Sequence, residues 1–160
     1  MQLSRQTLED LEFPEILENI ATFSFNEKTA QLIRELQPYE DHELLIKDLK
    51  TTNEYLSSFE SENRIPFSEF YYMSDFLPRL NIENYYLDVE QFFQIKSNAL
   101  QIKEITKFFA KFEEYFPELQ RIVSKIIYEN EIVKEIDNVF NKHGEIKNSA
   151  SNELAEIRRK

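Results

Sequence analysis

Apolar residues recur at helical spacing along most of the chain, and a long early stretch of this pattern follows Asp41. Asp41 can cap a helix, and the apolar positions after it advance by steps of three and four residues, the spacing of one helix face. The inward set predicted for this helix is Leu45, Leu49, Thr52, Leu56 and Phe59. The pattern indicates a long amphipathic helix.

Three shorter helices are predicted before it. One covers residues 4–11, and the next starts at Phe13, where Pro14 suits the first turn of a helix. A third follows Asn26, which can act as its cap, and ends near Pro38. The first quarter of the chain is therefore expected to be helical.

The clearest helix pattern begins after Asp88, with Gln91 three residues on in a capping-box arrangement. The predicted helix ends at Pro117. Its wide apolar face predicts a position in the middle of a helical bundle. The positions on that face are Phe92, Ile95, Ala99, Leu100, Ile102, Ile105, Phe108, Phe109, Phe112 and Phe116.

Shorter elements are predicted around this helix. Residues 61–68 read as a loop, and the aromatic-rich stretch 69–80 as a short helix. Another helix is expected over 117–127, and one more after Asn130 as its cap. The fold class predicted is mainly α, a multi-helix bundle.

The pattern changes near the C-terminal end, around the single glycine of the chain, Gly144. Apolar residues on both sides of this turn predict a small β-hairpin within Phe140–Asn148, with positive φ at Gly144. A new helix should open at Ser151. We therefore expect a helical core domain over 1–138, and a hairpin with the start of a lever helix over 139–160. Because the chain stops inside that helix, it is expected to be a piece of a longer protein.

Composition excludes several classes of function. A net charge of −11 argues against a surface that grips nucleic acid alone, since phosphate binding needs basic residues. The visible basic cluster is Arg158, Arg159 and Lys160. Without cysteine there is neither a disulfide framework nor a thiolate metal site, and no apolar run is long enough to span a bilayer. A cytoplasmic protein is expected, without membrane contact.

No catalytic constellation can be assembled. His42 and His143 lack a second ligand at metal-binding spacing, and one glycine cannot form a P-loop or a dinucleotide fingerprint. The recurring carboxylates read as solvated faces, because acid–base chemistry needs a desolvated group. These are Glu9, Glu12, Glu15, Glu18, Glu113 and Glu114. We expect no catalytic, cofactor-binding or metal-binding residue in this chain.

One aromatic segment has two readings. It could stack single-stranded bases, but Glu69 and Asp75 flank it instead of lysine or arginine. Core packing or a protein–protein patch is favoured. Its members are Phe67, Phe70, Tyr71, Tyr72 and Phe76.

The C-terminal segment resembles a junction in the MutS superfamily, most of all in its bacterial type-two branch, which lacks the mismatch-reading domains. That branch has a turn glycine, an apolar residue two positions on, Asp-x-Ala-Ser, a leucine and Ile-Arg-Arg. Asn148 stands at the usual aspartate, which keeps a capping side chain but removes a charge. The matching residues are Gly144, Ile146, Asn148, Ala150, Ser151, Leu154, Ile157, Arg158 and Arg159.

The first part of the chain is similar to the same branch, in the opening stretch 7–13 and in Leu36-Gln37-Pro38 before Asp41. The resemblance implies a longer parent with a P-loop ATPase domain, using ATP and Mg, and a small nuclease domain beyond Lys160. That parent would be a homodimer that clamps branched DNA or stalled ribosomes, in DNA repair and control of recombination. This chain would be its non-catalytic N-terminal core.

The helix opening at Ser151 would then begin a lever arm, with Leu154 and Ile157 as its first inward residues. The alternative is a free-standing helical adaptor that binds a protein partner through the aromatic segment. A helical metal–carboxylate enzyme is the third reading, and no ligand set supports it. For the isolated chain we expect no strong nucleic-acid binding, while exposed apolar faces favour self-association.

Overall fold

The structure is a computed structural model that describes residues 4–60, 64–68 and 70–158. The chain forms two compact units, residues 1–64 and residues 65–160. They are described separately below. The domain boundary predicted between residues 138 and 139 stays a prediction.

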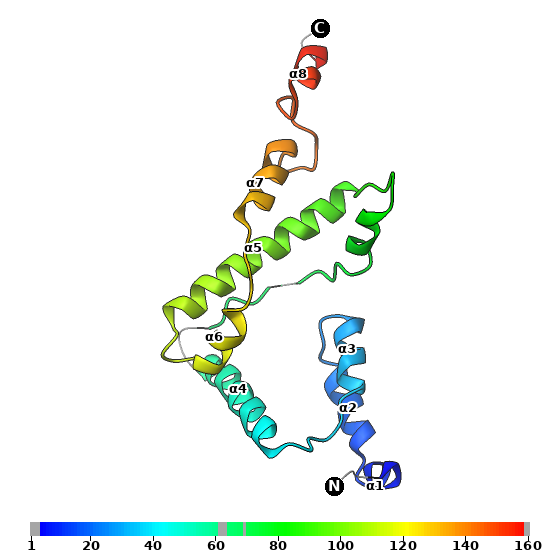
Figure 1. The fold of residues 1–160 in the computed structure, drawn as a ribbon, viewed down its shortest axis with the longest axis vertical. Helices are drawn as coiled ribbons and strands as arrows, with labels where there is room; N and C mark the ends of the chain where they lie inside the picture. The colour runs from blue at the N-terminus through cyan, green and yellow to red at the C-terminus, as the bar shows by residue number, and fades with distance from the viewer. Residues whose placement is uncertain (1–3, 61–63, 69, 159–160) are drawn as a thin grey trace. The chain divides into compact units, whose positions relative to one another are not determined.

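The first unit contains four described helices: α1 (Arg5–Asp10), α2 (Phe13–Ala21), α3 (Glu27–Arg34) and α4 (His42–Glu60) (Figure 1). The predicted caps are confirmed. The Oδ1 atom of Asn26 accepts the Thr29 N–H at 2.9 Å, and Oδ1 of Asp41 accepts the Glu43 N–H at 2.8 Å. Each cap satisfies an amide that has no partner inside its helix.

Helix α2 packs against α1 and α3, and small and aliphatic residues make the contact. Leu17, Ala21 and Ala30 are buried there. The guanidinium of Arg34 joins the helices at the surface, since it donates to Glu18 at 2.7 Å and to Glu27 at 2.9 Å. Packing and a bidentate ion pair therefore hold α2 and α3 together.

The prediction that one face of α4 is buried is wrong in this structure. Leu49, Leu56 and Phe59 are 54%, 58% and 54% exposed, and the buried residue of the helix is Ser58. Among the described helices of the first unit, α4 packs against none of the other three. The periodicity predicted the helix correctly, but a stripe is buried only where another element covers it.

The second unit contains the 3₁₀ helix η1 (Leu77–Asn81) and four described α-helices. These are α5 (Val89–Lys111), α6 (Pro117–Val123), α7 (Asn130–Val139) and α8 (Asn152–Arg158). The capping box at the start of α5 is confirmed in both directions. The Gln91 N–H donates to Asp88 at 2.8 Å, and the Asp88 N–H donates to the Gln91 side chain at 2.9 Å.

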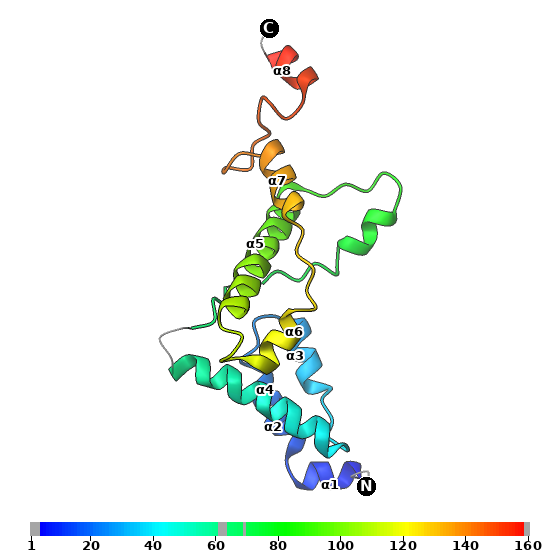
Figure 2. The same cartoon turned by 60° about the vertical axis from the view of Figure 1, so that its left-hand side comes forward.

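Helix α5 is the central helix of this unit, as its apolar face predicted, and it packs against α6 and α7 (Figure 2). It ends at Lys111 and not at Pro117. The chain turns at Phe112 so that Phe116 folds back onto Phe108 and Phe109, with ring centroids 5.9 Å apart in both pairs. Phe109 and Phe116 are buried with Val123 of α6 in one apolar cluster.

The short helix predicted over 69–80 is wrong, and its first residue lies outside the described residues. The backbone is irregular from Phe70 to Met73 and turns into η1. The cause lies on α5, where two buried polar side chains bind this backbone and the segment just before it. Asn98 holds Tyr71, and Gln101 donates to the Pro66 carbonyl and accepts from the Ser68 hydroxyl.

Two further boundaries differ from the prediction. Helix α6 ends at Val123, four residues before the expected end. Asn130 is the first residue of α7 and not its cap, because its side chain accepts a hydrogen bond from the Tyr128 hydroxyl at 2.9 Å. Glu129 takes the cap position without a capping side-chain bond.

The mainly helical fold is confirmed, while the small hairpin is not. Residues 4–60, 64–68 and 70–158 contain no strand, and the expected hairpin is reduced to an isolated antiparallel bridge between Phe140 and Ile146. No helix in this part of the chain is long and apolar enough to cross a membrane.

Candidate functional site at the Gly144 turn

The turn after α7 is built around the side chain of Asn141. Its Oδ1 atom accepts the N–H groups of His143 at 2.8 Å and of Glu145 at 3.1 Å, and its Nδ2 donates to the Glu145 carboxylate at 2.8 Å. Gly144 has φ +81°, the left-handed conformation that glycine adopts without steric cost. The positive φ predicted there is therefore confirmed.

The turn rests on the first turns of α5. A Cβ built on Gly144 would lie 3.1 Å from Cγ1 of Val89 and 3.8 Å from the Phe93 ring. The buried ring of Phe140 lies 5.4 Å from that of Phe92 and 6.1 Å from that of Phe93. The backbone angle thus favours glycine here, and a Cβ would also require the Val89 side chain to move by a few tenths of an ångström.

Polar contacts fix the end of α7 to the same place. Lys96 of α5 pairs with Asp137, and the Lys147 side chain donates to the Asp137 carbonyl. The Lys147 N–H donates to the Val139 carbonyl at 2.8 Å. The end of α7 is therefore anchored to α5 before the glycine, and the segment after the glycine is bonded back to α7.

Helix α8 leaves from this turn and is tied back to it by one side chain. The Ser151 hydroxyl accepts the Leu154 N–H at 3.1 Å, which confirms the predicted helix start. The Arg158 guanidinium donates to the Ile146 carbonyl at 3.0 Å and to Oδ1 of Asn148 at 2.7 Å. Figures 1 and 2 both draw α8 beyond α7, away from α5.

Part of the predicted motif is brought together by these contacts. Ile146, Asn148 and Arg158 line one depression of about 560 Å³. The Ala150 N–H donates to the Lys147 carbonyl at 3.0 Å, which continues the path to α8. These contacts bear on the local geometry alone, and the role of the motif as a family signature stays a prediction.

The rest of the motif is not gathered at this depression. Leu154 is half-buried, but Ile157 is 68% exposed, so within this chain it does not point inward. Arg159, like Lys160, lies outside the described residues. The inward face predicted for the lever is therefore uncovered at Ile157.

The sequence did not reveal the residues that position this turn. Asn141 and Lys147 do so, yet nothing in the spacing sets them apart from other polar residues beside a turn. An asparagine two or three residues before a glycine is a usable signal, because its side chain can bind the backbone of an Asx turn.

The contacts described at the turn position the backbone and the start of α8. His143 and His42 are both exposed. In the part of the chain that the structure describes, no three His, Cys, Asp or Glu side chains form a group able to hold a metal. The residues present do not fit ATP with Mg, since a single glycine cannot supply a phosphate-binding loop.

The recurring carboxylates are solvated, as predicted. Glu9, Glu15 and Glu18 are exposed on the first two helices, Glu12 is exposed between them, and Glu113 and Glu114 are exposed after α5. The hydrogen bonds from Arg34 lower the pKa of Glu18 below its ordinary value, and the same contacts raise the pKa of Arg34. A carboxylate held in its ionised form by a cation does not serve as a general acid near neutral pH.

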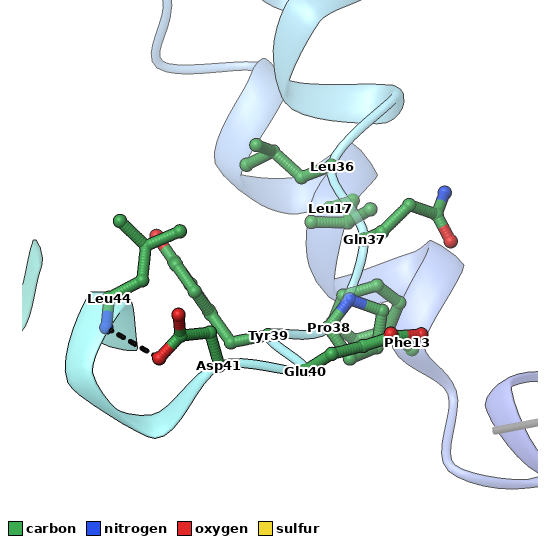
Figure 3. Close-up of a pocket in the computed structure, with 9 residues that line it drawn as sticks. All are labelled: Phe13, Leu17, Leu36, Gln37, Pro38, Tyr39, Glu40, Asp41 and Leu44. Carbon is green, nitrogen blue, oxygen red and sulfur yellow. Dashed lines mark hydrogen bonds between the residues drawn. The ribbon is translucent and has the colours of Figure 1, made fainter. Parts of the chain in front are cut away.

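The first unit has an apolar groove that the sequence did not reveal. It encloses about 570 Å³ between the start of α2, the segment after α3 and the start of α4 (Figure 3). The Tyr39 hydroxyl donates to Asp48 of α4 at 2.6 Å, and this hydrogen bond raises the pKa of Tyr39. The residues lining the groove are Phe13, Leu17, Leu36, Gln37, Pro38, Tyr39, Glu40, Asp41 and Leu44.

The fold and the turn define a helical module from which a helix leaves at a glycine. Seven curated proteins that match this chain are all named Endonuclease MutS2, so the resemblance to the type-two MutS branch is confirmed. The protein of Pelotomaculum thermopropionicum is 26% identical over 160 residues, 99% of this chain and 20% of its own length. That of Carboxydothermus hydrogenoformans is 27% identical over 158 residues, 98% of this chain and 20% of its length.

A more divergent relative from Aquifex aeolicus is 24% identical over 153 residues, 93% of this chain and 19% of its own length. The chain thus spans about a fifth of the length of the curated relatives it matches. No protein-family model matches the chain. No solved structure matches it either.

Proposed function

We propose that this chain is the non-catalytic structural core of a MutS2-type protein, and that its C-terminal turn aims a lever helix. The observation that carries the proposal is the similarity of nearly the whole chain to one fifth of proteins named Endonuclease MutS2. The residues that resemble the family motif include Asn148 and Arg158, which are hydrogen-bonded to each other and join α8 to the segment before it, and this supports the proposal.

The geometry of the turn supports this role. A lever needs a base that transmits force without absorbing it, and closely packed side chains resist compression. Phe140 packs on two rings of α5, and Gly144 lies against Val89. Arg158 then limits the directions in which α8 can leave. The turn is thus packed on α5, and α8 is bonded to the turn.

The remaining activities belong to the proposed parent protein. They are ATP hydrolysis with Mg, a nuclease domain, a homodimer, and the clamping of branched DNA or a stalled ribosome in recombination control. The net charge of −11 supports placing nucleic-acid contacts elsewhere in the parent. This chain would act on those steps through the position of the lever alone.

The proposal is tested by comparing the isolated chain with the protein extended through the full length of its relatives. We expect the extended protein to hydrolyse ATP and to bind a four-way DNA junction at 150 mM salt, roughly the physiological level. The isolated chain should do neither. ATP hydrolysis or equally tight junction binding by the isolated chain would overturn the proposal, as would an extended protein that lacks both activities.

A further inference from the structure

We propose that the groove of the first unit binds a basic amphipathic helix of a partner protein. The groove is the surface lined by Phe13, Leu17, Leu36, Tyr39 and Leu44, with Glu40 and Asp41 at its edge. This inference concerns a different unit from the turn at Gly144. It stands or falls independently of the proposed lever.

The walls of the groove are apolar and accessible. Leu36, Tyr39 and Leu44 are each about half-exposed, while Leu17 forms a buried floor. Figure 3 shows Leu36 and Leu17 facing Leu44 and Tyr39 across the opening. Apolar side chains on both walls of an open groove fit the apolar face of a helix, whose side chains would be removed from water there.

A second depression of about 450 Å³ adjoins the groove and extends the binding surface toward α1. The two share Phe13, Leu17, Leu36 and Gln37. An extended surface of this kind suits a helix, which offers apolar side chains on successive turns, better than it suits a compact small molecule.

The negative charge around the groove favours a positively charged partner. Residues 1–64 contain fourteen acidic and six basic residues, a net charge of −8. The two arginines that border the second depression are already neutralised, because Arg5 pairs with Glu9 at 3.0 Å and Arg34 pairs with Glu18. Among the described ion pairs, none uses Glu40 or Asp41.

Charge complementarity therefore favours lysine and arginine on the solvent side of the bound helix. It disfavours a second copy of this chain, since two acidic units repel each other. The hydroxyl of Tyr39, held by Asp48, keeps one wall in place before the partner arrives. A wall that is already ordered reduces the entropy lost on binding.

The test uses the full chain and three labelled peptides of equal length. The first places leucines on one helix face and lysines on the other. The second keeps the leucines and replaces every lysine by glutamate, and the third has the composition of the first in shuffled order. Fluorescence anisotropy measures affinity, and methyl NMR signals of Leu17, Leu36 and Leu44 report the binding surface.

We expect the first peptide alone to bind, to shift those methyl signals, and to bind more weakly as salt rises. Glu40→Lys should weaken it about twofold to fivefold, the effect of one exposed charge pair. The matched control is Glu60→Lys, which makes the same charge change at the far end of α4, roughly 27 Å from the first residue of that helix, and should leave affinity unchanged. Leu36→Ser should weaken binding with an unchanged circular dichroism spectrum.

Three results would overturn the inference. Equal binding of the glutamate peptide would mean that charge does not select the partner, and equal binding of the shuffled peptide would mean that charge alone acts. Concentration-dependent dimerisation that Leu36→Ser abolishes would assign the groove to a second copy. Peptide binding is also measured with Gly144→Val, whose substitution lies in the other unit and should leave the groove intact. Unchanged peptide affinity in that variant shows that the groove and the proposed lever are tested separately.

Discussion

The side-chain amide of Asn98 pairs with both backbone polar groups of Tyr71. Its Oδ1 accepts the Tyr71 N–H at 2.9 Å, and its Nδ2 donates to the Tyr71 carbonyl at 2.7 Å. Asn98 is 1% exposed, so these bonds are made where water does not compete. The Asn98 amide thus makes the pair of hydrogen bonds that a neighbouring β-strand would make with Tyr71, and it holds the segment before η1 against α5.

Replacing Asn98 by alanine should destabilise the second unit by about 2 kcal/mol, because it removes two hydrogen bonds that a buried amide makes to the Tyr71 backbone. Urea unfolding followed by tyrosine fluorescence measures the change. Gln94→Ala on the same helix serves as the control, and it should cost less because no described hydrogen bond uses that side chain. Equal effects of the two substitutions would contradict the role assigned to Asn98.

Substitution of Gly144 should act on the turn and on the start of α5. Valine there must adopt φ near +81° and bring a Cβ to 3.1 Å from Val89, so Gly144→Val should displace the turn. Amide chemical shifts from Phe140 to Ile146 and at Val89 and Phe93 should change, while those of α6 should not.

Gly144→Asn separates the effect of the positive φ from the effect of the added Cβ, since asparagine tolerates positive φ better than valine but still adds a Cβ. We expect it to shift the signal of Val89 while perturbing the backbone of the turn less. Unchanged amide shifts around the turn in Gly144→Val would show that glycine is not required there.

The contact of Arg158 with Asn148 should hold the start of α8. Arg158→Met keeps an unbranched side chain but removes both donors, so amide hydrogen exchange at Leu154 and Ala155 should become faster. Asn148→Asp should slow exchange, because a carboxylate accepts the same bond more strongly. Since the pair is exposed, each change should correspond to less than about 1 kcal/mol.

A double-mutant cycle provides the control. In the Arg158→Met background, Asn148→Asp should no longer slow exchange. If the aspartate slows exchange equally with and without Arg158, the stabilisation comes from some other contact of residue 148.

Glu18 should titrate below its ordinary value because Arg34 donates to its carboxylate. The ionised form is favoured in the folded chain, so this contact stabilises the fold fully above the pKa of the unfolded chain. The stabilisation is lost as the pH falls through the lowered pKa of the folded chain. In Arg34→Met the pKa of Glu18 should return upward, measured by NMR titration of the side-chain carbons.

The sequence predicted those parts of the fold that local residues determine. The caps Asn26, Asp41 and Asp88, the helix start at Ser151 and the positive φ at Gly144 are all present. Each depends on hydrogen bonds or sterics within a few residues, so the local sequence is sufficient.

The errors arose where distant contacts decide the structure. The aromatic stretch 69–80 was predicted to be a helix, but Asn98 of α5 binds the backbone of Tyr71, and Gln101 of α5 binds the Pro66 carbonyl just before the stretch. Both are polar residues on a helix whose predicted face was apolar. The stripe containing Leu49 and Leu56 of α4 shows the converse, since periodicity reports an apolar face but not whether anything covers it.

The candidate site was predictable in part. Gly144 and Ser151 could be assigned from their local chemistry, and the motif suggested Arg158. Its acceptors could not be assigned, because the Ile146 carbonyl and Asn148 meet it only after the chain has turned. The groove could not be foreseen either, as its walls come from three segments that no single periodic pattern connects.

The direction of α8 relative to α5 can be measured in the chain itself, which has no cysteine of its own. Ala110 of α5 and Glu156 of α8 are both exposed, so each can be replaced by cysteine and spin-labelled. Pulsed electron paramagnetic resonance would then measure the distance between the two labels. We predict one narrow distance distribution that broadens or shifts in Gly144→Val. A broad distribution in the unsubstituted turn, or one that Gly144→Val leaves unchanged, would contradict the claim that this turn aims the outgoing helix.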